Sequence, residues 1–144
     1  MTPMTCIRRI ALTGLLAGMA PHHAIADVVV VVSASSAINN LSEQDVAAIF
    51  LGRCSDVGGA ILVPIDQPED SVQRHDFYQR LTGKSAAQLK AYWSRIIFTG
   101  AGQPPREVAG DAATKLALAK DKAAIGYMDA SSLDAHLKVV LVLR

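Results

Sequence analysis

Residues 61–77 read ILVPIDQPEDSVQRHDF and contain three consecutive local signals. The apolar run at 61–65 is typical of a buried strand, and an acidic loop follows it at 66–70. Ser71 is a favourable N-cap, and Phe77 and Leu81 then fall four residues apart on one helix face. The stretch therefore predicts a strand whose carboxyl end leads through a short loop into a helix.

The same alternation continues on both sides. Five consecutive valines at 28–32 predict a strand covered on both faces, as in a parallel sheet. Ser42 with Asp45 predicts a capped helix that ends near Gly52. Further helices are predicted from Ser85 and from Asp111 as caps, and further strands at 124–127 and 139–143. Strands that alternate with helices indicate an α/β fold with a mainly parallel sheet flanked by helices.

The composition excludes several classes of function. The chain has 144 residues, of which 51% are hydrophobic and 19% charged, so it is long and apolar enough for one folded domain. A formal net charge of +1 and 5% aromatic residues argue against a nucleic-acid partner. Two cysteines are too few for a disulfide-dense scaffold or a four-thiolate zinc site.

The first 26 residues have the pattern of an export signal. Arg8 and Arg9 precede an apolar stretch at 10–20 that is too short to span a bilayer comfortably. Ala24-Ile25-Ala26 then supplies a small-x-small cleavage pattern. We expect a signal peptide at 1–26, a periplasmic mature domain at 27–144, and, as the alternative, an uncleaved membrane anchor.

Few residues of the mature sequence suggest catalysis. His75 and His136 are isolated, there is no Gly-x-Ser-x-Gly elbow, and nothing has the spacing of metal ligands. Cys54 is expected to be a partly buried apolar residue, with an intermolecular disulfide or a reactive thiol as alternatives. We therefore predict that the chain is not an enzyme and uses neither a metal nor a cofactor.

Two junctions between strands and loops are candidate anion sites. Ligands of open α/β sheets bind at the carboxyl ends of strands, where the first N–H groups of a helix attract negative charge. One junction is the polar loop with Ser33, Ser35 and Ser36. The other is the helix start at Ser71, where Arg74 lies one turn in and offers a bidentate contact.

Ordinary explanations exist for the second junction as well. Ser71 can be a simple N-cap, and Arg74 can be a solvated helix residue. Asp66, Glu69 and Asp70 surround the same helix start. Their charge suits the helix dipole but opposes a bound dianion.

Longer motifs resemble a known family. They are IFLGR at 49–53, DQPEDS at 66–71, KSAAQLKAYWSR at 84–95, IFTGAGQPP at 97–105 and AIGY at 124–127. Over nearly all of 27–143 the chain resembles the small phosphate-binding-protein-like family of exported proteins. The resemblance implies a single lobe of a type II periplasmic-binding-protein-like fold, a phosphate or other small oxyanion as ligand, and a link to an ABC permease.

The phosphate signature of the two-lobed relatives is incomplete here. Of their Arg-x-x-x-Ser-Gly-Thr segment only Ser71 matches, because Gln67, Val72 and Gln73 stand at the Arg, Gly and Thr positions. Asp70 stands where the small relatives tend to have Gly. A few hydrogen bonds on an open half-site predict weak binding, roughly millimolar, unless a homodimer or an envelope partner completes it. The alternatives are a ligand-free interaction module of the cell envelope and, third, a hydrolase.

Overall fold

The structure is a computed structural model that describes residues 26–144. The expected export signal lies outside these residues, apart from Ala26, and stays a prediction. Within 26–144, no helix is both long enough and apolar enough to cross a membrane.

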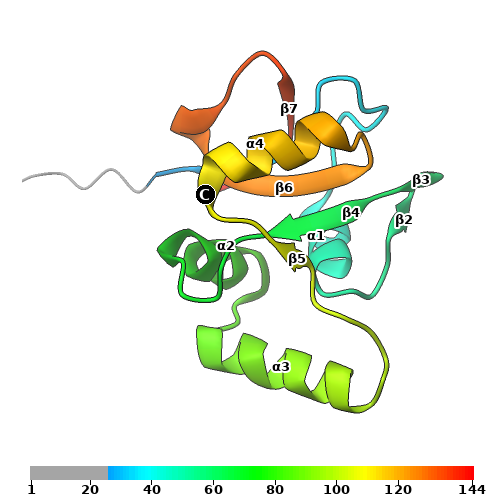
Figure 1. Ribbon diagram of the computed structural model, residues 1–144, viewed down its shortest axis with the longest axis vertical. Coiled ribbons are helices and arrows are strands. Elements are labelled where there is room, and N and C mark those ends of the chain that lie inside the picture. Colours follow the sequence, from blue (N-terminus) through cyan, green and yellow to red (C-terminus); the bar gives the residue numbers. More distant parts are fainter. Residues whose placement is uncertain (1–25) are drawn as a thin grey trace, which may run out of the picture.

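A mixed sheet with helices on both faces forms the described part of the chain (Figure 1). Its strand order is β5-β4-β6-β1-β7. The strands are β1 (Val28–Ser33), β4 (Val63–Asp66), β5 (Arg106–Glu107), β6 (Ala124–Asp129) and β7 (Leu137–Leu143). β4 pairs in parallel with β5 and β6, whereas β1 is antiparallel to β6 and β7. Four strands thus share one direction, and the predicted α/β class with a mainly parallel sheet is confirmed.

The direction of β1 differs from the expectation drawn from its valines. All five are buried, because β1 is a central strand with helices over both faces. A continuous apolar run indicates that both faces of a strand are buried. It does not indicate strand direction, because parallel and antiparallel strands can both be covered on two faces. The prediction of burial was correct, and the implied parallel pairing was wrong.

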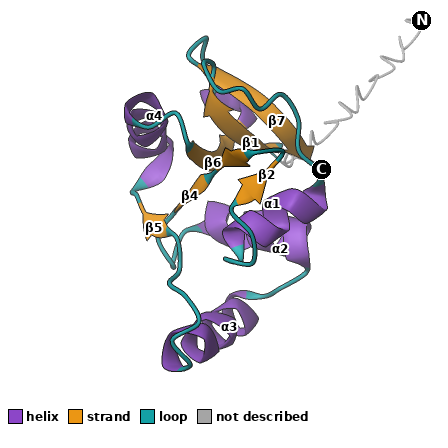
Figure 2. Cartoon of the chain, turned by 90° about the vertical axis from the view of Figure 1, so that its right-hand side faces the viewer, coloured by secondary structure: helices purple, strands orange, loops and turns teal. Residues whose placement is uncertain are grey.

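Helices separate the core into two clusters. On one face, α4 (Gly110–Lys120) packs Leu118 against Val29, Val31 and Met128. The other face carries α1 (Glu43–Phe50) and α2 (Val72–Thr82), and Figure 2 shows them opposite α4. Their cluster contains Phe50 and aromatic residues of α2 and β6. A short hairpin, β2 (Asp56–Val57) and β3 (Ala60–Ile61), precedes β4.

Helix α3 (Ala86–Phe98) extends along one end of the molecule and stands away from the sheet in both ribbon views (Figures 1 and 2). Leu89 and Trp93 are its buried residues, and the Tyr92 hydroxyl donates to the carbonyl of Leu51 at 2.7 Å. Phe98, at its end, is almost fully exposed. The predicted amphipathic face therefore packs from Leu89 to Ile96, whereas Ile97 and Phe98 at its end are exposed.

Three of the four predicted helix starts are confirmed. Ser42, Ser71 and Ser85 each accept a hydrogen bond from the third N–H of their helix. The prediction for Asp111 was wrong, because α4 begins at Gly110 without a side-chain cap. The Asp111 carboxylate instead accepts from the Ser132 hydroxyl of the short 3-10 helix η1 (Ala130–Ser132) at 2.6 Å. A tertiary contact thus replaced the local cap.

Candidate functional site

The first turn of α2 starts directly after the carboxyl end of β4. The Ser71 hydroxyl accepts the N–H of Arg74 at 3.3 Å and donates to the side-chain oxygen of Gln67 at 3.3 Å. The N–H groups of Val72 and Gln73 have no acceptor among residues 26–144. An open groove of about 750 Å³ runs beside Val72 and Gln73. Two N–H groups without an acceptor therefore belong to residues that line this groove, while the Ser71 hydroxyl is engaged by Gln67.

Two glutamine side chains close part of this helix start. The Gln67 amide nitrogen donates to the side-chain oxygen of Gln73 at 2.6 Å and to Asp111 at 3.2 Å. Gln67 is buried, with 3% of its surface exposed. At these positions the resemblance places the Arg and Thr of the phosphate signature. The structure has instead a neutral amide pair that is satisfied within the chain.

Arg74 lies in the interior and is not a solvated helix residue. Only 7% of its surface is exposed, and its Nε donates to Asp66 Oδ2 at 3.2 Å. Its guanidinium also lies 5.6 Å from the centre of the Tyr78 ring. Burial is the largest single effect and opposes its charge, but Asp66, Tyr78 and Tyr127 together outweigh burial and raise the pKa of Arg74. The guanidinium is thus held by α2 and β4 rather than aimed at the helix start.

Asp66 is the centre of a buried polar network. Its carboxylate accepts from the Tyr78 hydroxyl at 2.7 Å, from the Tyr127 hydroxyl at 2.6 Å and from the N–H of Gln67 at 2.8 Å. Burial, together with the negative charge of Asp66, raises the pKa of Tyr78 and of Tyr127 well above the ordinary value. Both phenols therefore remain protonated donors at neutral pH and hold the junction between β4, α2 and β6.

The network makes stability depend on alkaline pH. The phenols of Tyr78 and Tyr127 keep their protons in the folded state, whereas an unfolded chain releases them above about pH 10. The folded state then binds more protons, so the free energy of unfolding falls as pH rises, by up to about 1.4 kcal/mol per pH unit for each phenol. Tyr127→Phe removes one of these contributions, so the stability difference between wild type and variant should be largest at neutral pH and should shrink above about pH 10. Urea unfolding at a series of pH values measures it; a difference independent of pH would contradict the assignment.

Sequence reasoning assigned Asp66 only to an acidic loop and did not pair it with the tyrosines. One available signal was Tyr127, because a phenol in a buried strand needs a hydrogen-bond partner. The partner is Asp66, which lies near Tyr127 because β4 and β6 are neighbouring parallel strands. Tyr127 and Asp66 are 61 positions apart, a separation that no local pattern reports.

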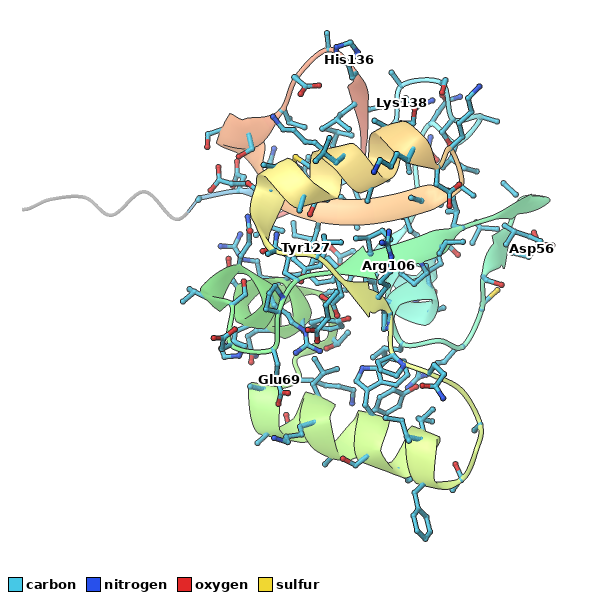
Figure 3. The ribbon with its side chains drawn as sticks, viewed as in Figure 1. Asp56, Glu69, Arg106, Tyr127, His136 and Lys138 are labelled. Carbon is cyan, nitrogen blue, oxygen red and sulfur yellow. The ribbon has the colours of Figure 1, made fainter. Side chains whose placement is uncertain are left out.

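The serine loop lies at the other end of the sheet. β1 runs opposite to β4, so Ser33, Ser35 and Ser36 follow the edge away from Ser71. Lys138 of β7 donates to the carbonyl of Ser36 at 2.7 Å, and Figure 3 shows Lys138 far from Glu69 of the α2 junction. The Ser33 and Ser35 hydroxyls bond each other at 2.9 Å. The structure therefore does not bring the five predicted site residues into one site.

The other residues considered in the sequence analysis, Cys54 and His75, lie on the surface. Cys54 is exposed, against the expectation of partial burial, and its thiol lies 3.1 Å from the carbonyl of Asp56. The His75 ring contacts the carbonyl of Glu69 at 2.9 Å on the surface. Among residues 26–144, no three His, Cys, Asp or Glu side chains are grouped so that they could hold a metal ion.

Comparison with solved structures defines the fold class. No family model matches the sequence, and no curated protein sequence matches it. The fold is that of a single lobe of phosphate ABC transporter substrate-binding proteins.

Three solved structures illustrate the similarity. An ABC-type phosphate transport receptor from Vibrio cholerae has 18% identity and a TM-score of 0.62 over 80% of this chain and 46% of its own. A putative phosphate ABC transporter substrate-binding protein with bound phosphate, from Clostridium perfringens, has 16% identity and a TM-score of 0.63 over 80% and 45%. PstS from Borrelia burgdorferi has 17% identity and a TM-score of 0.60 over 80% and 47%. This chain thus spans less than half the length of each.

Proposed function

We propose that this chain is a periplasmic solute-binding protein that holds phosphate or a similar small oxyanion at the start of α2. The observation that carries the proposal is the pair of free N–H groups at Val72 and Gln73 beside the Ser71 hydroxyl. Its fold, shared with phosphate transport receptors, supports the same ligand class. The proposed role is non-enzymatic, with an ABC permease or a second copy of the chain as partner.

Binding at this site is expected to be weak. A first helix turn attracts an anion through its N–H groups and the helix dipole, without any cationic side chain. Arg74 adds no contact here, because it does not line the groove beside Val72 and Gln73. Asp70 is exposed in the same loop and repels a dianion. A few neutral hydrogen bonds in water give a dissociation constant on the order of millimolar.

Calorimetric titration with phosphate tests the proposal. We expect millimolar affinity for the purified chain and a loss of about threefold to tenfold in Ser71→Ala, because one neutral hydrogen bond is removed. Ser42→Ala is the matched control, since Ser42 caps α1 and loses the same kind of helix cap. No heat of binding at tens of millimolar phosphate, or equal losses in both variants, would refute an anion site at α2.

A second candidate function is an interaction module that keeps the fold without a ligand. The bonds from Gln67 to Gln73 and Asp111 favour it, because they satisfy polar groups that a ligand would otherwise engage. In that case the titration is silent and a stable envelope partner is recovered with the chain. The two functions thus give opposite results in the same pair of measurements.

A further inference from the structure

A second, smaller cleft lies between the α2 junction and α3. Its volume is about 230 Å³, and its charged lining residues are Arg74, Lys90, Glu69 and Glu107. None of Ser71, Val72 and Gln73 lines it, so it is separate from the proposed oxyanion site. Figure 3 shows Glu69 in the space between α2 and α3.

Arg74 presents unused donors to this cleft. Its Nε is fixed by Asp66, but its two terminal nitrogens have no hydrogen-bond acceptor within the part of the chain that the structure describes. The Arg74 side chain is about nine-tenths buried, but its terminal nitrogens are not among the fully buried unpaired atoms, so they still reach the solvent of the cleft. Because Asp66 and Tyr78 hold it in place, the remaining fork is preorganised for a planar, bidentate carboxylate.

Trp93 also lines this cleft, and its indole can report on what happens there. Its indole nitrogen is buried and has no hydrogen-bond partner among residues 26–144. The far edge of its six-membered ring lies against Gly52, where an added Cβ would be 3.2 Å from Cη2. The pyrrole ring that carries the nitrogen is therefore at the opposite end of the indole from Gly52. Trp93 lines this cleft together with Arg74 and also lines the neighbouring cleft beside Gly52, so its indole serves as a reporter of occupancy rather than as a contact.

The other charged residues of the cleft indicate which charges a ligand would carry. Lys90 and Glu69 form an exposed ion pair at 3.3 Å and neutralise each other. Glu107 has no ion pair in the described residues, and it forms none with Arg74, although both line the same small cleft. Free positive and negative groups are thus separated across one cavity. A dianion such as phosphate would be repelled by Glu107, whereas a molecule with one charge of each sign would bridge the gap.

We propose that this cleft binds a small zwitterion of the α-amino acid class. The carboxylate is held by the terminal nitrogens of Arg74, and the ammonium group by Glu107. Ile97 and Pro104 line the same cleft and provide an apolar surface for a short aliphatic side chain. The proposal does not depend on oxyanion binding at Ser71.

The single tryptophan of the chain makes the test direct, because the indole N–H of Trp93 gives one cross-peak in a nitrogen–proton NMR spectrum. The probes are L-leucine, isocaproate, which lacks the ammonium group, and isoamylamine, which lacks the carboxylate. We expect L-leucine to move this cross-peak saturably, and each analogue to bind about tenfold more weakly, because one charge-assisted hydrogen bond is missing.

Glu107→Gln separates the proposal from a nonspecific effect. Glu107 is exposed, so the variant is expected to fold, and it should weaken L-leucine by about tenfold without weakening isocaproate. Glu43→Gln on α1 is the matched control and should have no effect. An unmoved cross-peak at tens of millimolar L-leucine, or equal affinity for L-leucine and isocaproate, would overturn the proposal. So would a cross-peak that responds to phosphate and loses this response in Ser71→Ala, because the response would then belong to the oxyanion site.

Discussion

Asp66→Ala is expected to lower the free energy of unfolding by about 3–5 kcal/mol, because it leaves a buried arginine without its counter-ion. The carboxylate is 1% exposed and is bonded to Arg74, Tyr78 and Tyr127. Its removal strands one charge and two phenol hydroxyls in the interior.

Urea unfolding measures this loss, with Asp70→Ala as the matched control. Asp70 is the same residue type in the same loop, but it is exposed, so its exchange should change the stability by no more than about 0.5 kcal/mol. The double variant Asp66→Ala with Arg74→Met tests the cause. If the stranded charge dominates, the double variant is more stable than Asp66→Ala alone. Equal losses for Asp66→Ala and Asp70→Ala would contradict the buried network.

Asp66 also links the two proposed sites. Its carboxylate holds the N–H of Gln67, which borders the α2 start, and the Nε of Arg74, which leaves the guanidinium fork in the second cleft. One buried group therefore orients residues on both sides of the junction. Destabilised but folded variants of Asp66 are expected to weaken binding at both places, whereas Ser71→Ala and Glu107→Gln each affect one.

The local elements were predictable because their signals are local. A serine followed three residues later by an acceptor and then by an apolar face predicted the starts of α1 and α3, and the structure has both capping boxes. Gly83 ends α2 with a positive φ of 69°, a conformation that favours glycine. The start of α2 was predicted from Ser71 as an N-cap, and Ser71 does cap this helix.

The spatial arrangement of these elements was harder to predict from the sequence. Apolar periodicity tells which residues are buried but not in which direction a strand runs, so the antiparallel β1 was missed. That direction separates Ser33 from Ser71. The burial of Arg74 was missed for a related reason, since its partner Asp66 comes from another element and has no spacing signal. The pairing of Gln67 with Gln73 also depends on side-chain positions that only the folded loop defines.

Phe77→Ala is the second large effect that we expect, with a loss of about 3–5 kcal/mol in the free energy of unfolding. Phe77 is fully buried on α2 and stacks on Tyr127, with ring centres 3.8 Å apart and planes 4° apart. Phe50 of α1 meets it edge-on at 4.9 Å. The exchange therefore leaves a cavity where α1, α2 and β6 meet, and it removes the ring that supports the Tyr127 phenol.

Phe98→Ala is its matched control, because the same atoms are removed from a side chain that is 93% exposed at the end of α3. Its effect should stay within about 0.5 kcal/mol. The pair separates burial from residue type, and similar losses in both would show that α2 is not packed as described. If the stacked ring also positions Tyr127, Phe77→Ala should reduce the alkaline dependence of stability as well, because a loosened phenol no longer keeps its proton above about pH 10. The aromatic cluster and the Asp66 network would then act as one unit, which anchors α2 to the sheet and fixes the helix start that the candidate ligand would meet.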